Sequence, residues 1–241
     1  MFYMLDKFTD AIEAFERYDQ LVPGSPRGKT YLAKSYYGKG DYDKALGILD
    51  EVLAKDPEYS EANKYKAYVL IEKKDYAQAD AFFDKVRPED LNSEDYTKRA
   101  KIHIDKKEYS EAYSDLDKAV SLDVNDENTY FEYGKALFAE QKYAEAKEKF
   151  NKAIELGILN VAAYVYAGIC DFYLNQFESG VQILTKSIEL NPNIASAYLW
   201  RANNYAGFSK NAEACADYKK YLEFEASDAF AQEQVKKFCG Q

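Results

Sequence analysis

Hydrophobic residues recur every three or four positions along this chain, in short blocks separated by a few polar residues. In one block the recurring positions are Tyr130, Tyr133, Gly134 and Leu137. Spacing of this kind places apolar side chains on one face of an α-helix. The pattern predicts twelve helices in six consecutive pairs, at residues 26–39 and 42–55, 60–73 and 76–86, 93–106 and 109–121, 127–140 and 143–156, 161–174 and 177–190, and 195–208 and 211–225.

A short sequence motif built around an aromatic residue recurs at an almost fixed interval. Its aromatic positions are Tyr42, Tyr76, Tyr109, Tyr143 and Phe177, separated by 34, 33, 34 and 34 residues. A period in this range is typical of a solenoid, in which each repeat buries its hydrophobic face against its neighbours.

The repeat that begins at Glu127 shows most clearly which solenoid this is. Its pattern residues are Tyr130, Tyr133, Gly134, Leu137, Tyr143, Ala146, Phe150 and Ala153. This pattern resembles the tetratricopeptide repeat, in which a small residue of the first helix faces apolar residues of the second. Small residues occupy that slot in six units, where two helices must approach closely: Ala33, Ala67, Ala100, Gly134, Gly168 and Ala202.

The resemblance implies an all-α fold, a right-handed solenoid of antiparallel helix pairs that forms a single array over residues 1–241. We expect six full repeats at 26–59, 60–92, 93–126, 127–160, 161–194 and 195–226. A capping helix at 227–241 follows, with Ala231, Val235 and Phe238 on its apolar face.

Residues 1–25 are expected to form a partial repeat. Phe8, Ala11, Phe15 and Pro23 fit the second helix of a unit that should begin about eight residues before Met1. Residues 2–5 are then the remainder of its first helix. A regulatory fragment of a larger multidomain protein therefore stays open as an interpretation.

Composition and charge narrow the classes of partner. The chain is 47% hydrophobic and 16% aromatic, with a formal net charge of −10. The negative charge argues against nucleic acid as a partner, because phosphate binding needs clustered Lys and Arg. The longest uncharged apolar run, residues 161–170, is too short to span a bilayer. The compartment stays open between the cytoplasm, which we favour, and a periplasmic or extracytoplasmic location.

The cysteines and the single histidine are expected to have packing roles. Cys170, Cys215 and Cys239 form an odd and widely spaced set, which suggests neither a disulfide framework nor a zinc site. We therefore expect free, buried or partly buried thiols. His103 stands where other repeats carry Tyr36 or Leu137, so packing is favoured over catalysis or metal binding.

No motif in the chain predicts an enzyme or a cofactor. Residues 27–30 read Arg-Gly-Lys-Thr, like the end of a phosphate-binding loop, but Pro23 stands where the full motif needs glycine. We therefore predict no catalytic residue, no cofactor and no metal.

The resemblance also implies a concave groove lined by the first helix of each pair. The candidate partner-binding residues on that face and beside it are Lys34, Tyr37, Lys64, Tyr68, Lys101, Phe131, Lys135, Phe138, Val165, Tyr166, Ile169, Phe172, Leu199, Trp200 and Asn203. Lysines dominate the first four repeats and apolar residues the last two. An acidic part of a partner is thus expected over the lysines and an apolar anchor beyond them.

The predicted function is a non-enzymatic scaffold that binds an extended or helical segment of a protein partner. The alternative is a carbohydrate- or small-ligand-binding subunit, in which Tyr65, Tyr68, Tyr166, Tyr173 and Trp200 act as stacking platforms. The oligomeric state stays open.

Overall fold

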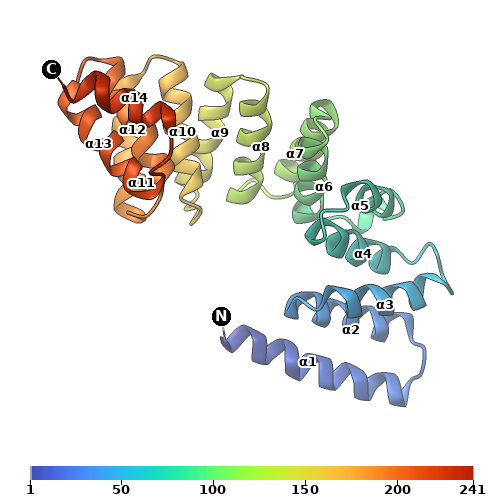
Figure 1. The fold of residues 1–241 in the computed structure, drawn as a ribbon. Coiled ribbons are helices and arrows are strands. Elements are labelled where there is room, and N and C mark those ends of the chain that lie inside the picture. Colours follow the sequence, from blue (N-terminus) through green and yellow to red (C-terminus); the bar gives the residue numbers. More distant parts are fainter. Residues whose placement is uncertain (1, 241) are drawn as a thin grey trace. The chain divides into compact units, whose positions relative to one another are not determined.

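The computed structural model describes residues 2–240, and that part of the chain is helical without any strand (Figure 1). None of its helices is both long enough and apolar enough to cross a membrane. In chain order the elements are α1 (Phe2–Leu21), α2 (Pro26–Lys39), α3 (Tyr42–Leu53), α4 (Ser60–Glu72), α5 (Tyr76–Phe83), the 3₁₀ turn η1 (Pro88–Asp90), α6 (Ser93–Asp105), α7 (Tyr109–Leu122), α8 (Glu127–Ala139), α9 (Tyr143–Glu155), α10 (Ala162–Tyr173), α11 (Phe177–Leu190), α12 (Ala195–Gly207), α13 (Asn211–Phe224) and α14 (Ala229–Phe238).

The helices form two compact units, Met1–Glu108 with α1 to α6 and Tyr109–Gln241 with α7 to α14. Within each unit, successive helices pack against one another as hairpins joined by short turns (Figure 1). This arrangement confirms the predicted all-α fold of paired helices. The repeat boundaries given above stay predictions.

Six turns between successive helices in residues 2–240 share the same geometry. The central residue of each turn has a positive φ, at Gly40, Lys74, Lys107, Gln141, Asn175 and Ser209. The next amide donates to a carbonyl five residues back, as in Lys142 to Leu137 and Gln176 to Asp171. This Schellman motif satisfies carbonyls that the helix end leaves open. The second helix begins two residues after the positive-φ residue in each case.

Close contact at the small-residue slot holds α8 to α9 and α10 to α11. A Cβ built on Gly134 would lie 2.6 Å from Cε1 of Phe150, and one on Gly168 would lie 2.4 Å from Cγ of Leu184. The alanines in the same slot, Ala33, Ala67, Ala100 and Ala202, are all fully buried. At the two glycines, a large side chain of the second helix therefore packs directly against the backbone of the first helix.

The N-terminal prediction of two helices was wrong. Residues 2–21 form the single helix α1. The sequence between Leu5 and Phe8 is Asp-Lys, without a glycine, a proline or a polar turn cluster, so nothing there interrupts the helix. Phe8 instead packs over Gly38 of α2, where a Cβ would lie 2.3 Å from its ring.

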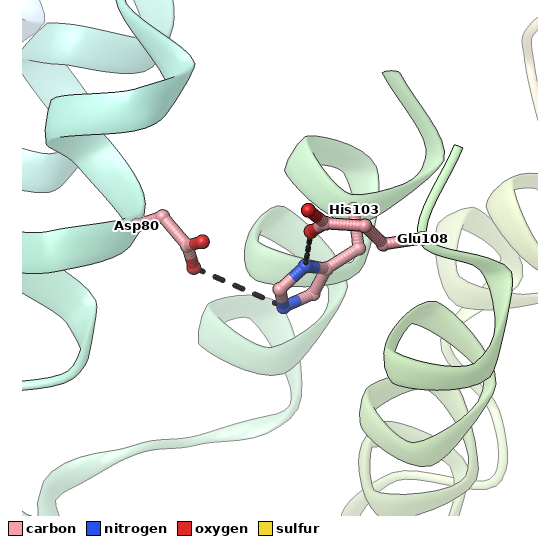
Figure 2. Close-up of side chains that lie close together, drawn as sticks. All are labelled: Asp80, His103 and Glu108. Carbon is pink, nitrogen blue, oxygen red and sulfur yellow. Dashed lines mark hydrogen bonds and ion pairs between the residues drawn. The ribbon is translucent and has the colours of Figure 1, made fainter. Parts of the chain in front are cut away.

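His103 does not have the purely apolar packing role expected of it. Its Nδ1 lies 2.9 Å from Oε2 of Glu108, and its Nε2 lies 3.8 Å from Oδ1 of Asp80. Figure 2 shows the imidazole ring between these two carboxylates. The sequence comparison missed this because the carboxylates come from a different helix and from the turn after α6.

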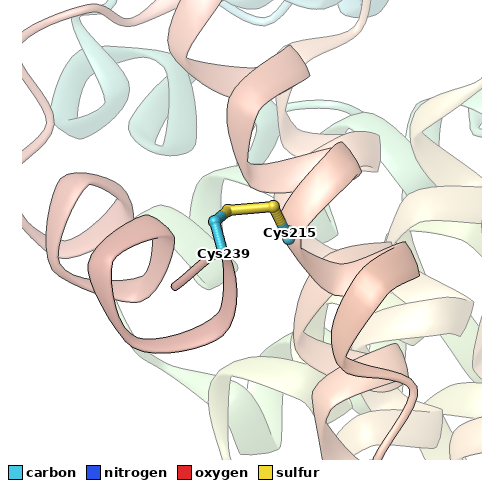
Figure 3. Close-up of a disulfide and its surroundings, with 2 residues drawn as sticks. All are labelled: Cys215 and Cys239. Atoms are coloured by element: carbon cyan, nitrogen blue, oxygen red, sulfur yellow. A yellow bond between two sulfur atoms is a disulfide. The ribbon is translucent and has the colours of Figure 1, made fainter. Parts of the chain in front are cut away.

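The expectation of three free thiols was also wrong. Cys215 of α13 and Cys239, which follows α14, form a disulfide (Figure 3). The bond ties the capping helix to the last repeat, where Ala231 is buried and Phe238 stacks on Tyr218. Cys170 is free and buried, as expected.

Replacing Gly134 by Leu tests the helix contact. The new side chain must enter space that Phe150 occupies, so we expect the free energy of unfolding to fall by about 1–3 kcal/mol or more. Gly47→Leu is the matched control, because a Cβ at that helical position meets nothing within 4 Å. Urea denaturation of both variants measures the difference, and equal stability would show that the slot at Gly134 is not tight.

Counting reactive thiols tests the disulfide and the burial of Cys170. Burial raises the pKa of Cys170 to about 12, so its thiolate is scarce at pH 8. Protein purified without reductant should show no rapidly reacting thiol when native. It should show one when unfolded and three after reduction. Three thiols in the unfolded, unreduced protein would exclude the bond.

Candidate functional site

A cavity of about 520 Å³ lies beside α10 in the second unit. Val165, Tyr166 and Ile169, three of the predicted groove residues, line it. Its other lining residues come from the loop before α10 and the first residue of that helix, and from the segment before α12 and the first turn of that helix: Leu159, Asn160, Val161, Ala162, Asn191, Ile194 and Ser196. Its volume falls within the range of about 300–1,000 Å³ that is usual for ligand sites. We call it the α10 cavity.

The rim of the α10 cavity is apolar and open. Leu159 is 96% exposed, an unusual state for a leucine at the edge of an apolar hollow. Val165 and Ile169 are buried at 6% and 7% exposure, so they form the floor of the cavity rather than its rim. Exposed apolar groups that adjoin a preformed hollow mark a contact site more often than scattered ones do.

None of the described residues that line the α10 cavity carries a charge. Its polar groups are Asn160, Asn191 and Ser196. The carboxamide oxygen of Asn160 accepts from the amide of Ala162, and that of Asn191 accepts from the amide of Asn193. The two side-chain NH₂ groups are not used in these hydrogen bonds, so they and the hydroxyl of Ser196 are the side-chain donors for a bound main chain.

Aromatic packing fixes the wall of the cavity. The ring of Tyr166 stacks on Phe150 at 5.2 Å between centroids and meets Phe138 edge-on at 5.1 Å. Phe131, 7% exposed, packs on the same ring. These contacts hold Tyr166 in one position. Phe131 and Phe138 themselves do not line the cavity.

The remaining predicted residues of the second unit lie outside the cavity. Phe172 and Trp200 pack on each other at 5.5 Å between centroids and are partly buried. Leu199 packs against two hydrophobic clusters between α12, α13 and α14, one around Tyr221 and one around Tyr218. Asn203 accepts a hydrogen bond from the hydroxyl of Tyr218 at 2.7 Å. Any contact that these residues make with a partner stays a prediction.

The four predicted lysines divide into two kinds. Lys64 pairs with Asp95 at 3.3 Å and donates to the carbonyl of Asp90 at 3.1 Å, while Lys135 pairs with Glu132 at 2.7 Å. Lys34 and Lys101 are exposed. The ammonium of Lys34 lies 5.2 Å from the ring centre of Tyr65, and a hydrogen bond to that tyrosine raises the pKa of Lys34. Lys34 and Lys101 therefore remain the cations presented to solvent in this set.

Tyr37 and Tyr68 belong to an aromatic cluster of the first unit. Their ring centres are 5.9 Å apart, and burial raises the pKa of Tyr37 to about 12. Tyr68 is 7% exposed and donates to the fully buried carboxylate of Asp95. Asp95 also completes the capping box of α6 with Asn92. Tyr68 thus supports a buried carboxylate.

The aromatic platforms needed for carbohydrate binding are mostly covered. Tyr65 and Tyr68 are 8% and 7% exposed, so a sugar cannot stack on their faces. Tyr173 is 46% exposed, but it stacks on Tyr143 at 4.3 Å between centroids. The carbohydrate alternative is not favoured.

Two family models, both described as tetratricopeptide repeat, match the sequence. One matches residues 36–102, and the other matches residues 96–126 and 127–156. Together they cover half of the chain. No curated protein sequence matches it.

Solved structures of similar fold span nearly the whole chain. A chain of the APC/C hetero-tetramer Cut9–Hcn1 is 14% identical over 95% of this chain and 46% of that one, with a TM-score of 0.72. YrrB, described as a TPR protein with an unusual peptide-binding site, is 23% identical over 78% of this chain and 97% of that one, with a TM-score of 0.65. PilF of Pseudomonas aeruginosa is 18% identical over 88% and 96%, with a TM-score of 0.72. At these identities the likeness shows the fold alone.

The division among the lysines predicts unequal effects on stability. Lys64→Ala leaves the buried carboxylate of Asp95 without its cation, so we expect a loss of about 2 kcal/mol or more in the free energy of unfolding. Lys101→Ala, on the exposed surface of α6, should change it by less than about 0.5 kcal/mol. Urea denaturation compares the two. Equal effects would mean that Lys64 is not part of the folded core.

Proposed function

Because the chain belongs to the tetratricopeptide repeat family, we propose that it is a non-enzymatic scaffold that holds a segment of a protein partner at the α10 cavity. Proteins of this family are generally interaction scaffolds, and the helical hairpins found here are their fold. The observation that carries the proposal is the apolar hollow beside the exposed Leu159.

The chemistry of the cavity describes the segment that fits it. An apolar floor without charged groups accepts one or two uncharged hydrophobic side chains. The amide groups of Asn160 and Asn191 supply donors for main-chain carbonyls of an extended segment. The peptide-binding site named for YrrB gives a precedent for peptide recognition on this fold.

Charge complementarity suggests a second, weaker contact with the partner. Lys34 and Lys101 are the predicted groove lysines at the surface, and both belong to the first unit. An acidic stretch of a partner is therefore proposed to bind the first unit through these two residues. Contacts of this kind mainly affect the association rate and its dependence on salt.

Filling the α10 cavity tests the proposal. Random peptides displayed on phage and selected on the full chain should be enriched in large apolar residues. Ser196→Trp places a bulky ring at an exposed lining position and should weaken the best selected peptide by about thirtyfold, the loss of one anchor residue. Fluorescence anisotropy measures the affinity.

Ala216→Trp is the matched control, because Ala216 is exposed on α13 and does not line the cavity. It should bind the peptide as the parent does. If Ser196→Trp also binds with unchanged affinity, the peptide does not use the α10 cavity. Circular dichroism spectra of both variants should match the parent, so a loss of binding does not reflect unfolding.

A further inference from the structure

The first unit brings together three side chains of metal-binding type. Asp80 lies on α5, His103 in the last turn of α6, and Glu108 directly before α7. One ligand atom from each lies within 4.8 Å of the others. Figure 2 shows the two carboxylates at opposite nitrogens of the imidazole ring, Asp80 at Nε2 and Glu108 at Nδ1. All three residues are partly buried, and the side chain of His103 is only 12% exposed.

Lys106 completes the cluster with a cation. Its ammonium lies 2.7 Å from Oδ2 of Asp80 and 2.8 Å from Oε2 of Glu108. An imidazole that binds a metal ion is neutral, and the two carboxylates with the one ammonium then carry a net charge of −1. The site therefore attracts a second cation.

We propose that Nε2 of His103 and the carboxylate of Asp80 bind a divalent transition-metal ion of the zinc type, with Glu108 as the positioning residue. Imidazole and carboxylate are the donor pair that zinc accepts, whereas calcium and magnesium take oxygen ligands. Zinc bonds of about 2.0–2.1 Å place neighbouring ligand atoms about 3.3 Å apart. The 3.8 Å between Nε2 and Oδ1 needs only a small side-chain movement.

Glu108 has the orienting role that carboxylates commonly take behind a metal-bound histidine. When Nε2 binds a metal ion, Nδ1 carries the proton and donates it to Glu108, 2.9 Å away, which fixes the ring. Lys106 opposes metal binding, because its ammonium pairs with the Asp80 carboxylate that serves as the ligand. The ion thus bridges α5 and α6 in competition with a resident ammonium.

The sequence makes this site unusually simple to test. His103 is the only histidine of the chain, so protein without a histidine tag gives a single imidazole signal by NMR. Cys215 and Cys239 are joined, and Cys170 is buried, so thiolates do not compete for zinc without reductant. Zinc chloride is the probe, with heat measured by titration calorimetry and the imidazole followed in parallel.

We expect saturable binding of one zinc ion per chain and a shift of the imidazole signal. His103→Ala and Asp80→Asn should each weaken binding at least tenfold. Asp80→Asn changes little in shape, so it remains informative if the alanine variant is poorly folded. Lys106→Gln should tighten binding about three- to tenfold, because it removes a unit charge that repels a divalent ion over about 6 Å in a high dielectric. The exposed Lys101→Gln is its control and should leave the affinity nearly unchanged.

Three results would overturn the proposal. The first is the absence of heat and of an imidazole shift at zinc in large excess. The second is binding of parental strength in both His103→Ala and Asp80→Asn, which would place the ion elsewhere. The third is equal affinity in Lys106→Gln and the parent, which would contradict the competition with the ammonium.

Discussion

The close approach of two helices at a residue without a large side chain is the constraint on which this structure depends. At Gly134 and Gly168 the backbone of the first helix is directly against Phe150 and Leu184 of the second. Val165 and Ile169 of α10 are buried in a cluster with Leu184 and Ala197, and they also line the α10 cavity. The packing that stabilises each hairpin therefore also determines which side chains a partner can reach.

Most of the fold could be predicted because each repeat carries its own local signals. The starts of the twelve predicted helices agree with those observed to within one residue, since each second helix begins at an aromatic residue or at Asn211 after a fixed Schellman turn. Features that join distant positions could not be predicted. The bond between Cys215 and Cys239 depends on how α14 folds back, and spacing alone does not give that path. Helix α1 is continuous because no turn signal precedes Phe8. The sequence already lacks such a signal, but the prediction gave more weight to the repeat register.

The candidate site could be predicted only in part, and the reasons differ between its apolar and charged residues. Helical spacing grouped Val165, Tyr166 and Ile169, because they share one helix, and all three line the α10 cavity. It could not show that the loop before α10 brings the exposed Leu159 to their rim. Ion pairs could not be predicted where the counter-ion comes from another element. Asp95 of α6 neutralises Lys64 of α4, and Asp80 of α5 reaches His103 of α6. Predicting charged sites thus requires knowing which turns of neighbouring helices face each other.

Methyl NMR during titration with a selected peptide tests the account most directly, because it reports every isoleucine, leucine and valine at once. The account predicts that the methyl signals of Leu159, Val165, Ile169 and Ile194, which line the cavity, shift with the added peptide. The signal of Leu116, fully buried in α7, should stay in place. Saturable binding that leaves Leu159 and Ile169 unmoved while other methyl groups shift would contradict it, and the docking surface would then lie elsewhere on the chain.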